Sequence, residues 1–249
     1  MKSSRIYIST IACDAVSTAL ANGFGLEIAE FCTAWNMDDT FAETDILVRE
    51  KLNGVRNRIL HAPFNELFPC AIDKKARALA EERYRQAIAL AKGYGATKVV
   101  IHGGYNRWIY YPVWYVEESV KFWKSFLEND PGVEIVLENV LEDDPGMLLD
   151  IVQGVDDPRL RLCLDVGHVN AYAKVPVMQW LESWQKYLSH FHIHNNDGSW
   201  DTHCPLDSGT VPMEEFLTHA DRLCPDATYT LELLEAAPSV NWMIRNRLI

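Results

Sequence analysis

The sequence lacks the long apolar runs and paired cysteines that identify several large classes of protein. No run of about 18 or more apolar residues occurs in the 249-residue chain, so we expect no membrane span. The N-terminal residues show neither an apolar segment nor a small-residue cleavage site, which argues against a secretory signal. The six cysteines are scattered, with no Cys-x-x-Cys pair. We therefore expect reduced thiols and a cytoplasmic protein.

Positive charge is scarce as well. The chain has 23 Lys and Arg residues against 35 Asp and Glu residues, which gives a formal net charge of −12. This excess disfavours nonspecific binding to polyanions, although a local basic groove stays compatible with it. No Gly-x-Gly-x-x-Gly motif follows the first predicted strand, as a doubly wound dinucleotide-binding sheet would require. No Ser/Gly/Pro-rich linker divides the chain, so we expect one domain over residues 1–249.

What the sequence does contain is a regular alternation of short apolar runs with longer helical segments. The apolar runs, which are rich in β-branched residues, predict eight strands at 5–10, 24–31, 58–62, 97–102, 133–138, 160–165, 190–194 and 228–233. The segments between them predict helices at 14–22, 40–54, 71–93, 114–129, 146–154, 175–188, 212–224 and a short one after Pro238. Eight such units, at about 31 residues each, predict an α/β fold, a single (β/α)₈ TIM barrel.

Side chains of the kind that bind metals stand at the ends of six consecutive predicted strands. Because chemistry in a TIM barrel lies at the C-terminal ends of the strands, we expect these side chains to converge. They are His61, His102, Glu138, Asp165, His168, His194, Asp201, His203 and Glu232. Imidazoles and carboxylates together suit Zn²⁺, Mn²⁺ or Fe²⁺. Since about four ligands saturate one cation, the set predicts several metals, or one metal with a polar substrate cage.

Residues 190–203 hold four of the chain's eight histidines. A strand over 190–194 would place His190, His192 and His194 on one face, because side chains alternate along a strand. We expect only His194, at the strand end, to reach the metal-binding end. His190 and His192 are expected to take interior or supporting positions.

In this order and spacing, the motifs resemble those of the xylose isomerase-like TIM barrels, also called the AP endonuclease family 2 superfamily. The resemblance covers nearly the whole chain. It is carried by Leu-His-Ala-Pro-Phe at 60–64, Val-Ile-His-Gly-Gly at 100–104, Leu-Glu-Asn at 137–139, Cys-Leu-Asp-Val-Gly-His at 163–168, His-Asn-Asn-Asp at 194–197, Asp-Thr-His at 201–203 and Leu-Glu at 231–232. It implies a divalent metal cofactor, Zn²⁺ or Mn²⁺, with one to three ions per chain.

Two branches of that superfamily imply different chemistry. In the sugar isomerase and epimerase branch, one metal would sit on Glu138, Asp165, His194 and Glu232. Glu138 and Glu232 would then be catalytic, moving a proton next to the sugar carbonyl. In the endonuclease IV branch, three Zn²⁺ ions would occupy all nine positions and act on a phosphodiester. Asp201 and His203 favour this multi-metal branch, because a one-metal isomerase does not require them.

The predicted loops favour the isomerase branch. A DNA-binding rim needs Lys and Arg for phosphate contacts, whereas the loops after the second and fifth strands are acidic. In the aromatic segment 105–115, Arg107 is a candidate phosphate or carboxylate clamp and Trp108 a candidate substrate wall; Trp200 is a candidate lid. The same segment could instead pack helices or join copies of the chain in a homo-oligomer.

The leading hypothesis is therefore a metal-dependent isomerase or epimerase of carbohydrate metabolism, with a small sugar or phosphosugar as substrate. The alternative is a multi-zinc phosphoesterase of the endonuclease IV type, with duplex DNA as the less favoured partner. A third interpretation, a sensor that binds metal or sugar without turnover, has only the acidic loops in its support.

Overall fold

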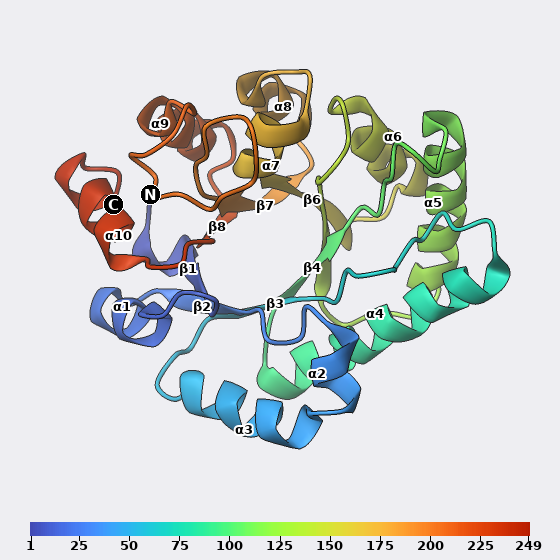
Figure 1. Ribbon diagram of the computed structural model, residues 1–249, viewed down its shortest axis with the longest axis horizontal. Helices are drawn as coiled ribbons and strands as arrows, with labels where there is room; N and C mark the ends of the chain where they lie inside the picture. The colour runs from blue at the N-terminus through green and yellow to red at the C-terminus, as the bar shows by residue number, and fades with distance from the viewer.

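Eight parallel strands close into a barrel, and their order around the ring follows the order in the chain (Figure 1). The computed structural model describes residues 1–249. The strands are β1 (Ile6–Ser9), β2 (Gly25–Ile28), β3 (Arg58–His61), β4 (Lys98–His102), β5 (Glu134–Glu138), β6 (Leu160–Asp165), β7 (Leu188–Ile193) and β8 (Thr228–Leu231). The ring closes because β8 pairs with β1, with Leu231 opposite Ile8. The prediction of a (β/α)₈ TIM barrel is confirmed.

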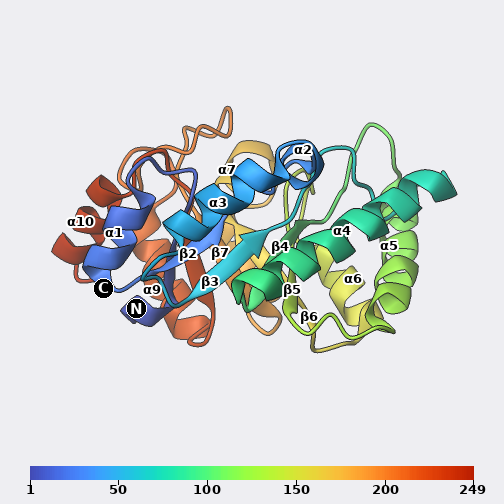
Figure 2. The same ribbon diagram turned by 90° about the horizontal axis from the view of Figure 1, so that it is seen from below.

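Helices surround the barrel on its outside, as both ribbon views show (Figures 1 and 2). They are the 3₁₀ helix η1 (Ser3–Arg5) and the α-helices α1 (Ala15–Asn22), α2 (Ala34–Asp38), α3 (Phe41–Lys51), α4 (Lys74–Tyr94), α5 (Pro112–Leu127), α6 (Gly146–Val155), α7 (Val166–Tyr172), α8 (Val177–Trp184), α9 (Met213–Leu223) and α10 (Ala237–Arg245). None of them is both long and apolar enough to cross a membrane. The longest, α4, begins after Asp73, whose carboxylate accepts a hydrogen bond from the Lys75 amide, and it ends at Gly95 in a left-handed conformation.

Besides small shifts of other element ends, two helices and one strand differ from the sequence prediction. The helix predicted at 40–54 is preceded by a separate short helix, α2. A further short helix, α7, starts directly after β6, where the Asp165 carboxylate accepts a hydrogen bond from the His168 amide. Strand β7 starts at Leu188 rather than at residue 190 and ends at Ile193.

The interior of the barrel changes from apolar to polar along its length. A small apolar cluster of Tyr7, Ile59, Val100, Val136 and Cys163 lies inside the ring. Two residues further along four of those strands come His61, His102, Glu138 and Asp165. Because side chains alternate along a strand, each of these polar residues faces the same interior as the apolar one before it. The strands thus present a floor of apolar side chains beneath a layer of histidines and carboxylates.

Candidate metal centre

Glu138, the last residue of β5, holds its carboxylate among four imidazoles. Its Oε2 lies 3.2 Å from His61 Nε2 and 3.5 Å from His102 Nε2. Its Oε1 lies 3.3 Å from His168 Nδ1 and 3.3 Å from His192 Nδ1. The side chain is 1% exposed. Each oxygen therefore faces a different pair of histidines, an arrangement that suits a carboxylate shared between two cation positions.

Three carboxylates converge on the Nδ1 atom of His192. This atom lies 3.3 Å from Glu138 Oε1, 3.5 Å from Glu232 Oε2 and 3.8 Å from Asp165 Oδ2. The ring is fully buried, and neither Nδ1 nor Glu138 Oε1 has a hydrogen-bond partner. Unpartnered buried polar atoms are costly unless something satisfies them, and a divalent cation would do so here. We call Glu138, Asp165, His192 and Glu232 the central group.

Asp201, in the loop after β7, contacts a second set of histidines. Its Oδ2 lies 3.1 Å from His203 Nε2 and 3.3 Å from His168 Nε2, and its Oδ1 lies 3.5 Å from His194 Nδ1. The rings of His194 and His203 stack with their centroids 4.0 Å apart. Burial alone would lower the pKa of His203, but the bond to Asp201 outweighs it and raises that pKa to about 9. We call these four residues the Asp201 group.

Three of the histidines are oriented by backbone carbonyls. The Nδ1 atoms of His61, His168 and His203 lie 2.8, 2.9 and 2.8 Å from the carbonyl oxygens of Ala62, Asn139 and Glu232. A neutral imidazole that donates its Nδ1 proton in this way leaves Nε2 as a lone pair. In each case Nε2 faces a carboxylate, Glu138 or Asp201. Both the donor set and its orientation fit divalent metal ions.

His194 takes its position through a close approach to α7. Its Nε2 lies 3.1 Å from Asp165 Oδ2, and its ring covers Gly167 so tightly that a Cβ at that position would overlap the imidazole. Only glycine lets the start of α7 pass beneath this ring.

The structure brings all nine candidate metal-binding residues to one end of the barrel, and it adds His192 to them. His194 Nε2 lies 3.1 Å from Asp165 Oδ2, and His192 Nδ1 lies beside Glu138, Glu232 and the same Asp165 oxygen. A one-residue register shift between β6 and β7, at Leu162 and Cys163, puts Asp165 opposite His192. The alternation of residues 190–194 was the signal for His192, since it places that side chain on the same face as His194.

The buried carboxylates and imidazoles shift one another's pKa values. Burial would raise the pKa of Glu138, but the neighbouring His192 and His102 lower it well below its usual range. Burial lowers the pKa of His102 to about 3, so this imidazole is neutral near neutral pH. Metal ions bind the neutral imidazole and the ionised carboxylate, so the shifts of Glu138 and His102 favour binding. Burial alone would lower the pKa values of the other histidines, but neighbouring acidic side chains raise them and so favour the charged imidazole in the metal-free site at His61, His168, His192 and His203.

The two groups open into a cavity of about 950 Å³ with largely apolar walls. Ile11, Phe64, Leu141, Trp108 and Trp200 are among the lining residues. Trp108 is 79% exposed and Trp200 66% exposed, so both stand at the opening. The Trp200 ring meets Tyr172 edge to face, with centroids 5.9 Å apart. The walls suit the apolar faces of a small molecule.

Arg107 is the only lysine or arginine among the residues that line this cavity. Its Nη1 lies 2.8 Å from Asp143 Oδ1, and its Nη2 donates hydrogen bonds to the carbonyls of Leu141 and Tyr172 at 2.7 and 3.2 Å. The guanidinium thus holds neighbouring segments together, and Asp143 neutralises its charge. The sequence predicts a clamp for phosphate or carboxylate, but the observed contacts leave this side chain little capacity for one.

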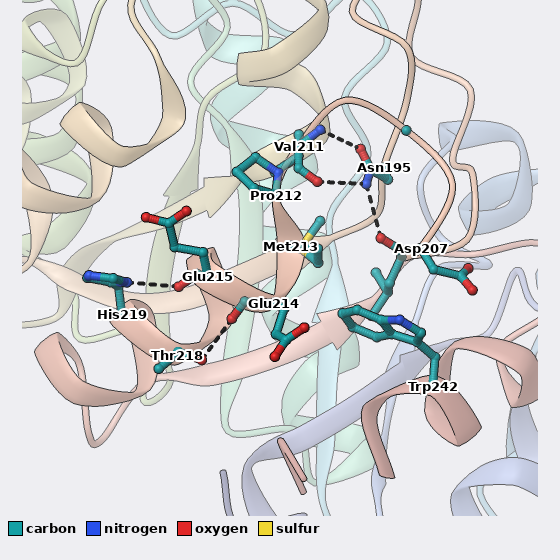
Figure 3. A pocket seen from close by; sticks show the side chains of 12 residues that line it. Asn195, Asp207, Val211, Pro212, Met213, Glu214, Glu215, Thr218, His219 and Trp242 are labelled. Carbon is teal, nitrogen blue, oxygen red and sulfur yellow. Dashed lines mark hydrogen bonds between the residues drawn. The ribbon is translucent and has the colours of Figure 1, made fainter. Parts of the chain in front are cut away.

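A second cavity, of about 550 Å³, lies beside α9 and α10 (Figure 3). Its polar groups already serve the local structure. The Asn195 amide donates to the carbonyls of Leu206 and Val211, and His219 contacts the Glu215 carbonyl. No histidine there faces a carboxylate as in the first cavity, so we place the candidate chemistry at the end of the barrel.

Comparison with known proteins defines the class. The model of the family described as "Xylose isomerase-like TIM barrel" matches residues 19–243, and the chain belongs to this family. The resemblance noted in the sequence is thereby confirmed.

Two curated relatives come from Methanocaldococcus jannaschii, and both are named as uncharacterized proteins. MJ1311 is 29% identical over 185 residues, which cover 70% of this chain and 63% of the relative. MJ1614 is 24% identical over 163 residues, which cover 63% of each protein. The matched regions thus span less than two thirds of these relatives.

Several solved structures share the fold over nearly the whole chain. A D-tagatose 3-epimerase-like protein has a TM-score of 0.79 at 23% identity, with 98% of this chain and 97% of that chain covered. The TTHB071 protein of Thermus thermophilus, soaked with ZnCl₂, has a TM-score of 0.77 at 23% identity and covers 98% of each chain. The IOLI protein with a bound zinc atom has a TM-score of 0.74 at 15% identity, with 98% and 96% covered. At these identities the likeness shows the fold.

Proposed function

We propose that this protein is a metal-dependent isomerase or epimerase that acts on a small, uncharged sugar. The observation that carries the proposal is the pairing of Glu138 and Glu232 on His192 Nδ1, at 3.3 and 3.5 Å, beside a cavity whose single cation is already neutralised. A sugar epimerase-like protein among the similar structures supports the same chemistry.

The central group would hold one divalent metal ion, Zn²⁺ or Mn²⁺. When bound, the metal supplies a Lewis acid that polarises the oxygen atoms of the substrate. Glu138, Asp165 and Glu232 are the hard oxygen ligands that Mn²⁺ prefers, and His192 is a ligand that suits either ion. We assign His192 to this role, and His194, which contacts Asp165, stays a candidate ligand.

Glu138 and Glu232 would transfer the proton at the carbon next to the carbonyl. One carboxylate removes the proton and the other returns it, so that the configuration or the carbonyl position changes. Both line the cavity; Glu138 ends strand β5 and Glu232 directly follows β8, with the β6 and β7 strands between them. Their placement at different strand ends would let a bound sugar lie between them.

The substrate class follows from charge and wall chemistry. A phosphosugar or a DNA strand needs free cations or amide clusters to balance its phosphate. The only lysine or arginine side chain that lines the cavity, Arg107, is already paired with Asp143. Three carboxylates, Glu138, Asp201 and Glu232, line it as well. Indole rings at the opening suit the C–H faces of a sugar. An unphosphorylated sugar or a related hydroxycarbonyl compound therefore fits best.

A second candidate function is a multi-zinc phosphoesterase of the endonuclease IV type. Its support is the two-sided carboxylate of Glu138, with different histidines at each oxygen, and the separate Asp201 group. These would accommodate more than one metal. The shortage of free positive charge at the cavity counts against a polyanionic substrate.

Product analysis with two substrate panels separates the candidates. The metal-loaded protein is incubated with free and phosphorylated ketoses and aldoses, and in parallel with an abasic-site duplex and a small phosphodiester. We expect new epimers or isomers from the free sugars by chromatography, and no phosphodiester cleavage. Cleavage of the phosphodiesters without any sugar conversion would establish the second candidate instead.

A further inference from the structure

Glu27, from strand β2, is a carboxylate buried completely inside the barrel. Its Oε1 lies 2.9 Å from His192 Nε2, on the other side of the imidazole from the three carboxylates of the central group; both atoms are buried, and neither makes a well-aligned hydrogen bond. Its Oε2 lies 3.1 Å from His190 Nε2 and accepts a hydrogen bond from the Thr230 hydroxyl at 2.5 Å. No lysine or arginine pairs with it. The polar side chains within hydrogen-bonding distance of it in the core are His190, His192 and Thr230.

We propose that Glu27 is a positioning residue for the central group: it accepts the Nε2 proton of His192 and so directs the Nδ1 lone pair at the metal position. A neutral imidazole carries one N–H, and the acceptor at one nitrogen decides that the other is free to bind metal. The proposal rests on the metal site of the proposed function, but it does not depend on which reaction that site performs.

Three other histidines of the site have a different kind of hydrogen-bond acceptor at the nitrogen that faces away from the metal position. His61, His168 and His203 direct Nδ1 at neutral backbone carbonyls. His192 instead meets a carboxylate. A charged acceptor binds an N–H more strongly than a neutral one, and its negative charge in the low-dielectric core adds to the attraction for a cation across the ring. Glu27 would therefore raise the basicity of this one ligand as well as fix its orientation.

The surroundings of the second carboxylate oxygen make the arrangement specific for glutamate. Thr230 donates to Oε2, and the Nε2 of His190 lies 3.1 Å from the same oxygen. Donors thus face both oxygens. A glutamine has one oxygen and one NH₂ group, so its NH₂ must meet donors on one side. If it meets His192, the ring must accept at Nε2, and its proton moves to Nδ1, where it opposes metal binding.

The variant Glu27→Gln tests this with little change in volume. Zinc affinity is measured by competition with a chromophoric chelator, and the histidine tautomers of the metal-free protein are measured by ¹⁵N NMR. We expect one zinc equivalent to bind about 10–100-fold more weakly. We also expect the Nε2–H signature of one buried histidine to be lost. Neither readout uses a substrate, so a failure of the proposed isomerase activity leaves both interpretable.

Glu30→Gln is the matched control. Glu30 follows the same strand but pairs with Lys51 at 2.7 Å, away from the central group. This variant loses the same charge and an ion pair, and it should keep its zinc affinity within about twofold, since the Glu30–Lys51 pair does not contact the histidines or carboxylates of the central group. Equal losses of zinc affinity in both variants would contradict the proposal.

Unchanged zinc affinity and unchanged histidine signals in Glu27→Gln would overturn the inference, as would a wild-type protein that binds no zinc. If Glu27→Gln does not fold, Glu27→Asp keeps the charge and draws the carboxylate back by one methylene. We expect a smaller loss of zinc affinity there, and wild-type affinity in a folded Glu27→Asp protein would equally contradict the role.

Discussion

Glu138 and Glu232 occupy similar strand ends but meet different surroundings. Glu138 is enclosed by four imidazoles, whereas Glu232 lines the cavity and is 8% exposed. His203 Nδ1 contacts the Glu232 carbonyl, so the Asp201 group also fixes the backbone at this position. Both carboxylates line the cavity, and Glu232 is the more accessible of the two proposed proton-transferring groups, while Glu138 also organises the histidines.

Replacing Glu232 with glutamine should remove one of the two proton-transferring groups. Because general acid–base catalysis contributes about 10²–10⁴-fold to a rate, we expect kcat to fall by that order while the fold is kept. Steady-state kinetics on the sugar that the protein converts gives the measurement. Glu235→Gln, at an exposed position three residues further on, is the control and should leave kcat unchanged. A wild-type rate in Glu232→Gln would exclude the proposed role.

Gly167 allows the His194 ring to lie against α7, and a methyl group there would overlap it. In Gly167→Ala we expect the ring to move away from Asp165 and Asp201, with loss of any metal held by the Asp201 group. Metal content by mass spectrometry would report this. Gly93→Ala is the control, because nothing lies within 4 Å of its added Cβ. In helix α4 that change should stabilise by about 0.5–1 kcal/mol. Equal metal content in both variants would contradict the account.

At the residue scale, much of the site is predictable from the sequence. The rule that barrel chemistry lies at strand ends selects all nine candidate residues. His192 escapes it because the register shift between β6 and β7 is not visible in the residue pattern. Glu27 escapes it because a single glutamate within a strand gives no sign of its partners, which come from strands β7 and β8.

At the element scale, Asp14 joins the first helix to the last. Its carboxylate accepts hydrogen bonds from the Ala236 and Ala237 amides, both at 2.8 Å, and from the Thr18 hydroxyl at 3.1 Å. Burial raises its pKa, but these bonds outweigh that effect and lower it overall. Asp14 thus ties the start of α1 to the start of α10 across the seam where β8 meets β1.

The Asp14→Asn variant should be less stable than the wild type by about 1–2 kcal/mol at neutral pH, a value reduced for its partial exposure to solvent. Since the folded-state pKa is lowered, the contribution is present above the unfolded pKa of about 4 and is lost as the pH falls through the folded value. Urea unfolding at several pH values measures it. The difference should shrink in acid; a constant difference would contradict the assignment. Asp226→Asn, at an exposed site, should have little effect.

The eight strands could be predicted to within a few residues, because β-branched apolar runs mark them clearly. The short helices α2 and α7 could not. In α7, Val166 and Val169 have the character of a strand, and the helix depends on the Asp165 cap, whose carboxylate also serves the central group. In α7, the cap formed by Asp165 therefore outweighs the strand propensity of the two valines.

At the scale of the whole molecule, alternation and strand count predict the barrel, but not the walls of its cavity. Those walls come from loops, and their composition does not determine their paths. Arg107 illustrates the limit: its contacts with Asp143, Leu141 and Tyr172 join segments that lie far apart in the chain.

A metal bound by the buried carboxylates would stabilise the folded state of the whole barrel. Binding at about 100 times the dissociation constant stabilises a protein by about 2.7 kcal/mol. For a chain of this length, we expect chelation to lower Tm by roughly 5–10 °C. The effect should diminish at acid pH, where protonated imidazoles no longer bind metal. Calorimetry with and without chelator measures it, and an unchanged Tm at neutral pH would contradict a metal centre in the core.

Proton transfer by Glu138 and Glu232 on an uncharged sugar is the central claim, and solvent-deuterium incorporation tests it most directly. The metal-loaded protein is incubated in D₂O with a panel of unphosphorylated ketoses and aldoses, and the sugars are examined by NMR. We expect deuterium at the carbon next to the carbonyl of at least one sugar, and none with Glu232→Gln. No incorporation into any sugar, together with cleavage of an abasic-site duplex, would contradict the claim.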